Sequence, residues 1–227
     1  TLLWADLTNK YVWIAVVSTA SFGAIGFVDD YLKVARETPR GLSVRGKLLA
    51  QGVVALAVGL ALIELARNNL YNTDIIFPFF KEFTPDIGWL YVPFAMIILL
   101  MTSNAVNLTD GLDGLAIRVF TVAAGAFTAL TYVSGHAVIA DFLLIVRFPP
   151  AGELTIFCGS LVGAGLGFLW YNSYPADVFM GDVGSLALGG ALGTVALLIK
   201  QELLLPIIGA VFLIEMISVV IQVGSFK

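Results

Sequence analysis

Charged residues are scarce in this chain. Only 12% of its 227 residues are Asp, Glu, Lys or Arg, whereas 59% are hydrophobic, and the mean hydropathy is +0.95. A soluble domain has roughly a quarter charged residues, so this chain has too few polar groups to cover a water-facing surface. Its apolar residues also form long runs instead of short alternating segments, which indicates helices that cross a bilayer.

Cysteine and histidine are nearly missing. The single cysteine, Cys158, excludes a disulfide within this chain and a two-cysteine metal site. The single histidine, His136, is expected in a solvated loop at the opposite membrane face from the acidic segments described below. No Ser-His-Asp or Cys-His arrangement can be built at the acidic face without another histidine. The net charge of -4 gives no basic surface for nucleic acid, so we expect no nucleic-acid partner.

The hydrophobic runs predict seven spans of about 20 residues, the length needed to cross ~30 Å of hydrocarbon. They are Tyr11–Val28, Gly46–Ala66, Trp89–Leu108, Leu115–Ser134, Glu153–Tyr171, Val183–Ile199 and Leu203–Val223. The predicted fold class is therefore all-α, a polytopic transmembrane helix bundle in which residues 1–227 form a single integral membrane domain.

The loop between the first two spans is the most basic part of the chain, with Lys33, Arg36, Arg40, Arg45 and Lys47. Basic loops are retained in the cytoplasm, so we expect this loop to be cytoplasmic. We interpret the first three of these residues as topology determinants. The last two open the next span, and they could equally reach back towards carboxylates or a phosphate.

Counting the crossings places three distant acidic segments at the same membrane face. They contain five carboxylates, those of Asp29, Asp30, Asp110, Asp113 and Asp182. Adjacent like charges are costly unless a cation neutralises them, and Mg²⁺ prefers carboxylate and phosphate oxygens. Taken one at a time, the same residues could instead be solvated helix ends, turn formers or N-caps. Their joint placement favours a metal-bound phosphate substrate.

Five segments, in order along nearly the whole chain, carry a family resemblance. They are GFVDDYLKV (26–34), GLSVRGKLLAQ (41–51), NAVNLTDGLDGLA (104–116), GAGLGFLWYNSYPADVFMGDVGSLALGG (163–190) and QVGSFK (222–227). The chain resembles the phospho-N-acetylmuramoyl-pentapeptide transferase (MraY) family, within the wider polyprenyl-phosphate hexose-1-phosphate transferases. That family has about ten spans. We therefore expect this chain to be a fragment that lacks N-terminal spans, a C-terminal histidine loop and a last helix.

The resemblance implies a role for thirteen residues. It implies a metal ligand at Asp182. It implies catalytic residues at Asp29 (the candidate general base), Asp30, Asp110, Asp113 and Lys47. It implies substrate-binding residues at Asn104, Asn107, Asn172, Phe179, Gly181, Ser185 and Gln222.

The resemblance also implies an activity and a location. UDP-MurNAc-pentapeptide and undecaprenyl phosphate would give lipid I and UMP in peptidoglycan synthesis, with Mg²⁺ as cofactor. The enzyme would be a homodimer in the bacterial cytoplasmic membrane, in contact with membrane lipid, and its active site would face the cytoplasm.

Two other functions remain open at this stage. A related transferase would use UDP-GlcNAc as its donor. A secondary transporter would place ion-binding acids near the middle of the bilayer. Only Glu215 lies deep within a predicted span, while the other acids of interest lie at span ends, which disfavours transport.

Overall fold

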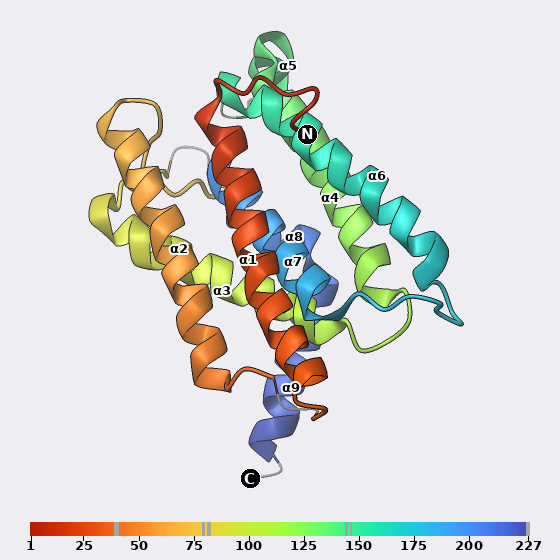
Figure 1. The fold of residues 1–227 in the computed structure, drawn as a ribbon. Helices are drawn as coiled ribbons and strands as arrows, with labels where there is room; N and C mark the ends of the chain where they lie inside the picture. The colour runs from red at the N-terminus through yellow and green to blue at the C-terminus, as the bar shows by residue number, and fades with distance from the viewer. Residues whose placement is uncertain (39–40, 79, 81–82, 144, 146, 226–227) are drawn as a thin grey trace.

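The computed structural model is a bundle of helices (Figure 1) and describes residues 1–38, 41–78, 80, 83–143, 145 and 147–225. The long helices are α1 (Lys10–Ala35), α2 (Val44–Arg67), α3 (Tyr91–Thr109), α4 (Leu115–Gly135), α6 (Leu154–Asn172), α7 (Gly181–Leu198) and α9 (Ala210–Ser225). Short helices are η1 (Gly88–Leu90), α5 (Ala137–Leu143), η2 (Pro149–Glu153) and α8 (Leu205–Ile208). The predicted all-α fold class is confirmed.

Six of these segments are long and apolar enough to cross a membrane. Their ends differ from the predicted spans mainly at α1, which continues past Val28 to Ala35. Asp29 and Asp30 therefore lie within the last turns of a continuous helix instead of just after it. Their side-chain directions are consequently fixed by helical geometry.

The seventh predicted span is divided in the structure. Its residues form the four-residue helix α8, which begins at Leu205 and has Pro206 in its first turn, and the 16-residue helix α9 after Gly209. Proline has no backbone N–H and is tolerated only at the start of a helix, and glycine readily leaves helical geometry. Hydrophobicity alone could not locate this break.

Helix α7 lies at the centre of the bundle. It packs along α1 and α3, and most of its residues from Ser185 to Leu198 are buried. Gly189 and Gly190 allow the backbone of α3 and the ring of Phe22 to approach this helix closely. Small residues at such contacts let helices pack tightly in lipid.

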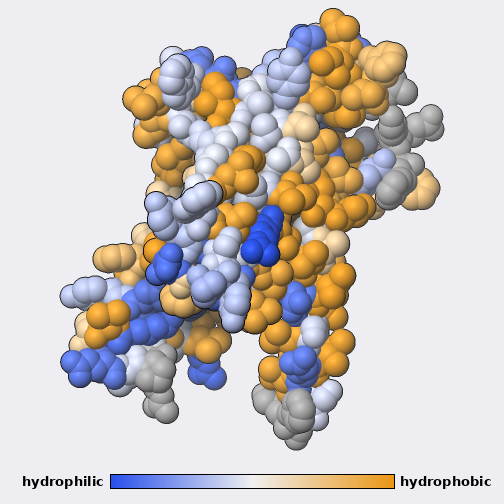
Figure 2. Space-filling model, turned by 90° about the vertical axis from the view of Figure 1, so that its right-hand side faces the viewer, coloured by the Kyte–Doolittle hydropathy of each residue, from blue (hydrophilic) through white to orange (hydrophobic). Residues whose placement is uncertain are grey.

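The surface is strongly apolar. Figure 2 shows broad hydrophobic areas over one face of the bundle, while hydrophilic side chains gather at its lower end. Large exposed apolar side chains include Val122, Leu166 and Trp170. Together with the long apolar helices, this surface is that of a multi-pass membrane protein. Of the five basic residues predicted between the first two spans, Lys33 lies in the last turn of α1, and Arg45 and Lys47 lie at the start of α2. Arg40 lies outside the described residues.

Candidate active site

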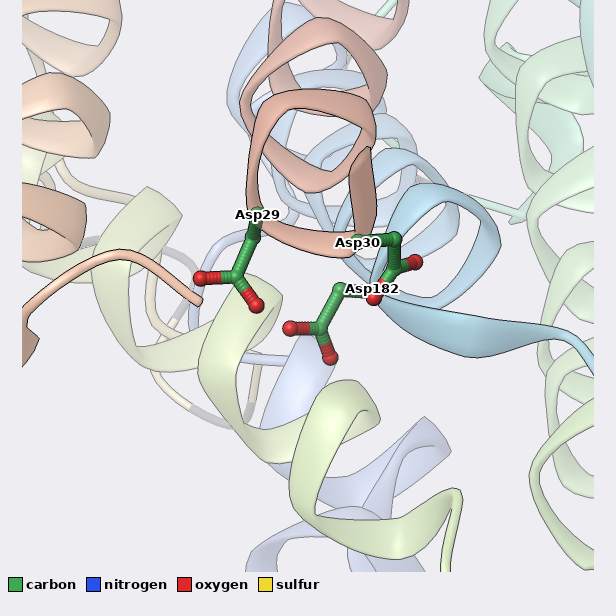
Figure 3. A group of neighbouring side chains, drawn as sticks. All are labelled: Asp29, Asp30 and Asp182. Atoms are coloured by element: carbon green, nitrogen blue, oxygen red, sulfur yellow. The ribbon is translucent and has the colours of Figure 1, made fainter. Parts of the chain in front are cut away.

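Three carboxylates meet at one end of the bundle, and they come from two helices that are far apart in the sequence. Asp29 and Asp30 come from the last turns of α1, and Asp182 comes from the first turn of α7. One oxygen from each lies within 4.8 Å of the others (Figure 3). Such a cluster of hard oxygen donors could hold a metal ion.

Two lysines neutralise this cluster. Lys33 Nζ lies 2.7 Å from Asp29, 2.9 Å from Asp30 and 2.9 Å from Asp182. Lys47 Nζ also lies 2.9 Å from Asp182, so the interpretation that Lys47 reaches back to a carboxylate is confirmed. Lys33, which the sequence indicates as a topology determinant, also pairs with all three carboxylates. Its spacing of three and four residues after the two aspartates is that of helical ion pairs and could have revealed the contact.

Asp29 is the most enclosed of the three, with only 3% of its surface exposed. The loop that follows α1 returns across it, and the backbone N–H of Leu42 donates a 2.6 Å hydrogen bond to Asp29 Oδ1. A Cβ at Gly41 would lie 2.5 Å from the same oxygen. A glycine is therefore needed here for the loop to cover the carboxylate, a feature that the sequence pattern did not predict.

The start of α7 fits closely against Asp30. Gly181 has a φ of +63°, which favours glycine, and a Cβ there would lie 2.8 Å from Asp30 Oδ2. The N–H of Val183 donates to the same oxygen at 3.2 Å. Negative charge is favourable at a helix N-terminus, so Asp30 acts on α7 as an external cap.

Asn107 connects the end of α3 to α7. Its Nδ2 donates hydrogen bonds of 2.6 Å to Asp182 Oδ1 and 2.8 Å to Ser185 Oγ. The Ser185 hydroxyl in turn donates to the carbonyl of Gly181. This network fixes the rotamer of Asp182, whose other oxygen accepts from both lysines.

Asn172 joins the loop before α4 to the loop before α7. Its side-chain oxygen accepts from the N–H of Gly114 at 3.1 Å, and its Nδ2 donates to the carbonyl of Val178 at 2.8 Å. Asp113 adds a second link by accepting from the N–H of Ala176 at 3.1 Å. Both side chains therefore hold the walls of the site together.

Two cavities flank the carboxylates. The first, of about 260 Å³, is lined by Asp30, Lys33, Asn107, Asp110, Gly111, Leu112, Asp113, Asn172, Phe179, Met180, Gly181 and Asp182. We call it the acidic cleft. The second, of about 690 Å³, is lined by Asp29, Lys33, Arg36, Gly41, Leu42, Ser43, Val44, Lys47, Leu48 and Asn104. We call it the basic cleft.

The Asp110 carboxyl group faces the acidic cleft. Burial, together with the negative charges of Asp182 and Asp30, raises its pKa to about 6. The ring of Phe179, which also lines this cleft, is 74% exposed and free to stack against a planar group. The acidic cleft thus combines carboxylates, the ammonium group of Lys33 and an open aromatic face.

Comparison with known proteins identifies the family of this chain. The family described as glycosyl transferase family 4 matches residues 12–200, which contain the three carboxylates and the lining of both clefts. The chain belongs to glycosyl transferase family 4.

Individual members of the family are closely similar. A phospho-N-acetylmuramoyl-pentapeptide-transferase of Koribacter versatilis (strain Ellin345) is 58% identical over 242 residues, which cover 100% of this chain and 64% of that protein. A protein of the same name from Maridesulfovibrio salexigens is 55% identical over 228 residues, covering 100% of this chain and 62% of that protein. The chain thus spans just under two thirds of the length of these relatives. The predicted resemblance is confirmed.

Five of the thirteen predicted residues do not line the acidic cleft. Asp29 and Lys47 line the basic cleft, as does Asn104, while Ser185 and Gln222 line neither. Asn104 lines the basic cleft, where its Nδ2 donates a 2.8 Å hydrogen bond to Gln51. Gln222 is exposed on α9, and its side chain donates to Ser218 of the same helix. The structure does not bring Gln222 into either cleft, and its role in substrate binding stays a prediction. Phe226 and Lys227 of the same motif lie outside the described residues.

Proposed function

We propose that the full-length protein transfers phospho-MurNAc-pentapeptide from UDP-MurNAc-pentapeptide to undecaprenyl phosphate, giving lipid I and UMP in peptidoglycan synthesis. The observation that carries the proposal is the carboxylate cluster of Asp29, Asp30 and Asp182 beside the acidic cleft. Lys33 contacts all three carboxylates, and Lys47 contacts Asp182. The names of the similar family members support the choice of donor over UDP-GlcNAc.

The donor set fits Mg²⁺. Three carboxylates supply hard oxygens, and Mg²⁺ is commonly held by one or two carboxylates together with substrate phosphates. Asp182 would be the principal ligand, with Asp30 or Asp29 beside it. When bound there, the ion would supply charge neutralisation for a diphosphate.

The residues of the site have separate tasks in this reaction. Phosphoryl transfer depends mainly on positioning and on neutralising charge. An oxygen of the carrier phosphate attacks the phosphorus bonded to the sugar, the bond from that phosphorus to the bridging oxygen breaks, and UMP leaves. Asp29 accepts the proton of the carrier phosphate, while Lys33 and Lys47 stabilise negative charge. Phe179 stacks against the uracil base, and Asn172 holds the loops that border it.

A membrane setting suits these substrates. The prenyl chain can stay in lipid while its phosphate reaches the polar end of the bundle. We propose that this end faces the cytoplasm in the bacterial inner membrane, because the basic residues at the end of α1 and the start of α2 lie there. We also propose that the enzyme acts as a homodimer.

The proposal is tested with the full-length protein in detergent. Radiolabelled UDP-MurNAc-pentapeptide and UDP-GlcNAc are supplied separately, each with undecaprenyl phosphate and Mg²⁺. We expect labelled lipid and UMP from the muramoyl donor only. Product from UDP-GlcNAc alone would favour the related transferase, and no product from either donor would contradict both enzyme functions.

Asp182→Asn provides the residue-level test. The substitution keeps the size of the side chain but removes the charge that faces a metal, so we expect turnover to be abolished. Asp177→Asn is the matched control, because Asp177 is an exposed aspartate in the loop just before α7. Full activity of Asp182→Asn with unchanged Mg²⁺ dependence would remove Asp182 as the metal ligand.

A further inference from the structure

Helices α1 and α7 touch at backbone level one turn before the paired aspartates of α1. Gly26 is buried there, and a Cβ added to it would lie 2.1 Å from the carbonyl oxygen of Asp182 and 2.6 Å from the nitrogen of Val183. Real Cβ atoms essentially never come closer than 3.0 Å to another heavy atom. The atoms in contact belong to the backbone, so no rotation of a side chain can relieve the overlap.

Elsewhere along the α1–α7 contact, the close approaches at Gly190 and Gly181 meet side chains, those of Phe22 and Asp30, and not backbone. At Gly23, one turn earlier on α1, an added Cβ would lie 3.4 Å from Cβ of Ala187, which is normal van der Waals contact. Further along, the hydroxyls of Ser18 and Thr194 form a buried 2.7 Å hydrogen bond that fixes the register of the two helices. Gly26, beside the site, is therefore the position at which an added Cβ would overlap the backbone of α7.

We propose that Gly26 is a positioning residue for the active site. Because it lacks a Cβ, the first turn of α7 can lie directly against α1, and this sets the distance from the Asp182 carboxylate to those of Asp29 and Asp30. Asp182 is itself the residue that Gly26 contacts, and the two α1 aspartates follow Gly26 by three and four positions, within about one helical turn. This inference rests on the proposed function.

A methyl group at position 26 has a definite consequence. Packed helices cannot interpenetrate, so α1 and α7 would have to separate locally by about 1 Å, and a shift of that size at a reacting centre can lower a rate on the order of 100-fold. Lys33 could then no longer reach all three carboxylates at its present distances. The geometry that would hold a divalent cation would be lost without changing any ligand.

The test compares Gly26→Ala with Gly23→Ala in the full-length protein. We measure Mn²⁺ affinity by electron paramagnetic resonance, and kcat and KM with UDP-MurNAc-pentapeptide. For Gly26→Ala we expect the Kd for Mn²⁺ to rise about tenfold or more and kcat to fall on the order of 100-fold, with KM changed less than about threefold. Gly23→Ala should keep all three values within about twofold of the wild type, because its Cβ meets only ordinary contact.

Several outcomes would overturn the inference. Unchanged Mn²⁺ affinity and kcat in Gly26→Ala, or equal losses in the two variants, would show that the contact does not position the site. Mn²⁺ that fails to bind the wild-type protein would also overturn it. If the wild type binds Mn²⁺ but makes no lipid product, the proposed function fails, while the role of Gly26 is still decided by the metal affinities.

A second measurement covers the case in which Gly26→Ala does not fold. The double variant Gly23→Cys/Ala187→Cys, in a background without other reactive cysteines, places two Cβ atoms close to disulfide range, which is about 3.5–4.5 Å. We expect oxidation to form the bond and activity to persist, because the disulfide joins helices that already lie together in the active arrangement. Loss of activity on oxidation, with recovery on reduction, would contradict the proposal.

Discussion

At the scale of single residues, the site depends on how one ammonium group is shared. Lys33 lies within 2.9 Å of all three carboxylates, and its side chain is 33% exposed. In an apolar protein, three carboxylates this close repel one another, so the lysine has a large effect on their arrangement. Substrate phosphates or a divalent cation would have to displace or rearrange these pairs.

Lys33→Met should therefore destabilise the metal-free protein, by about 1–3 kcal/mol, because it leaves carboxylates without their shared partner. Added Mg²⁺ should restore more stability to this variant than to the wild type, since the ion neutralises the same charges. Thermal unfolding in detergent, with and without Mg²⁺, measures both effects. Arg45→Met is the control, because Arg45 is exposed in the first turn of α2. Equal Mg²⁺ responses in the two variants would contradict the shared role of Lys33.

Asp110 gives a prediction that depends on pH. Its pKa is raised to about 6 by burial and by nearby negative charge, so the folded protein binds a proton more tightly than the unfolded chain does. Its contribution to stability is therefore fully present at low pH and is lost as pH rises through about 6. Asp110→Asn should be more stable than the wild type at pH 8, on the order of 1 kcal/mol because the side chain is partly exposed, and about equal at pH 4.

Thermal unfolding curves of the metal-free wild type and of Asp110→Asn, recorded at several pH values, test this prediction. The exposed Asp177→Asn serves as the control, since its carboxyl group lies away from the acidic cleft lining. A stabilisation by Asp110→Asn that is the same at pH 4 and pH 8 would contradict the raised pKa.

At the scale of elements, a second polar cluster connects helices at the end of the bundle opposite the carboxylates. Lys200, just after α7, is 2% exposed and lies 3.4 Å from the fully buried Glu202. Its ammonium group also lies over the rings of Tyr71 and Tyr91, at 4.8 and 4.1 Å. Burial lowers the pKa of Lys200 and raises that of Glu202, while the attraction between them opposes both shifts. This cluster ties the C-terminal end of α7 to the start of α3.

Removing one member of this pair should be costly. Lys200→Met leaves the Glu202 carboxylate buried without its counter-ion, which typically costs about 3–5 kcal/mol. Glu202→Gln keeps a hydrogen-bond acceptor for Tyr91 and leaves a lysine that can lose its proton, so its effect should be smaller. Arg67→Met is the control, because its pair with Glu64 is exposed and 3.9 Å long. If unfolding curves show that Arg67→Met loses as much stability as Lys200→Met, a structural role for the cluster is contradicted.

At the scale of the whole molecule, the two polar ends are separated by apolar helices. The end with the carboxylate cluster contains the starts of α2, α4 and α7, and the other end contains the Lys200 cluster and an isolated bridge between Asp74 and Asp86. Their separation along spans of about 20 residues matches the thickness of a bilayer. We propose that the basic residues at the end of α1 and the start of α2 set the orientation.

Labelling with a membrane-impermeant maleimide tests this orientation in intact cells whose outer barrier has been permeabilised. Asn72→Cys, at the Lys200 end, should react from outside. Tyr174→Cys, in the exposed loop before α7, should react only after the inner membrane is opened, because we expect that loop to be cytoplasmic. The opposite labelling pattern would show that the active site faces outward.

The sequence by itself determined that this chain is a helical membrane protein with its acidic segments at one end. Long apolar runs and the parity of crossings are properties of the chain order, so they could be read before folding. The three carboxylates of Asp29, Asp30 and Asp182 were predicted together for this reason, and Lys47 was recognised as able to reach them.

Only the tertiary structure decided how those groups meet. The sharing of Lys33, the cover of Gly41 over Asp29, the contact of Gly26 with α7 and the break at Gly209 depend on distances and angles between elements. Such quantities arise from packing among residues far apart in sequence, where a difference of one methyl group determines whether two backbones can touch.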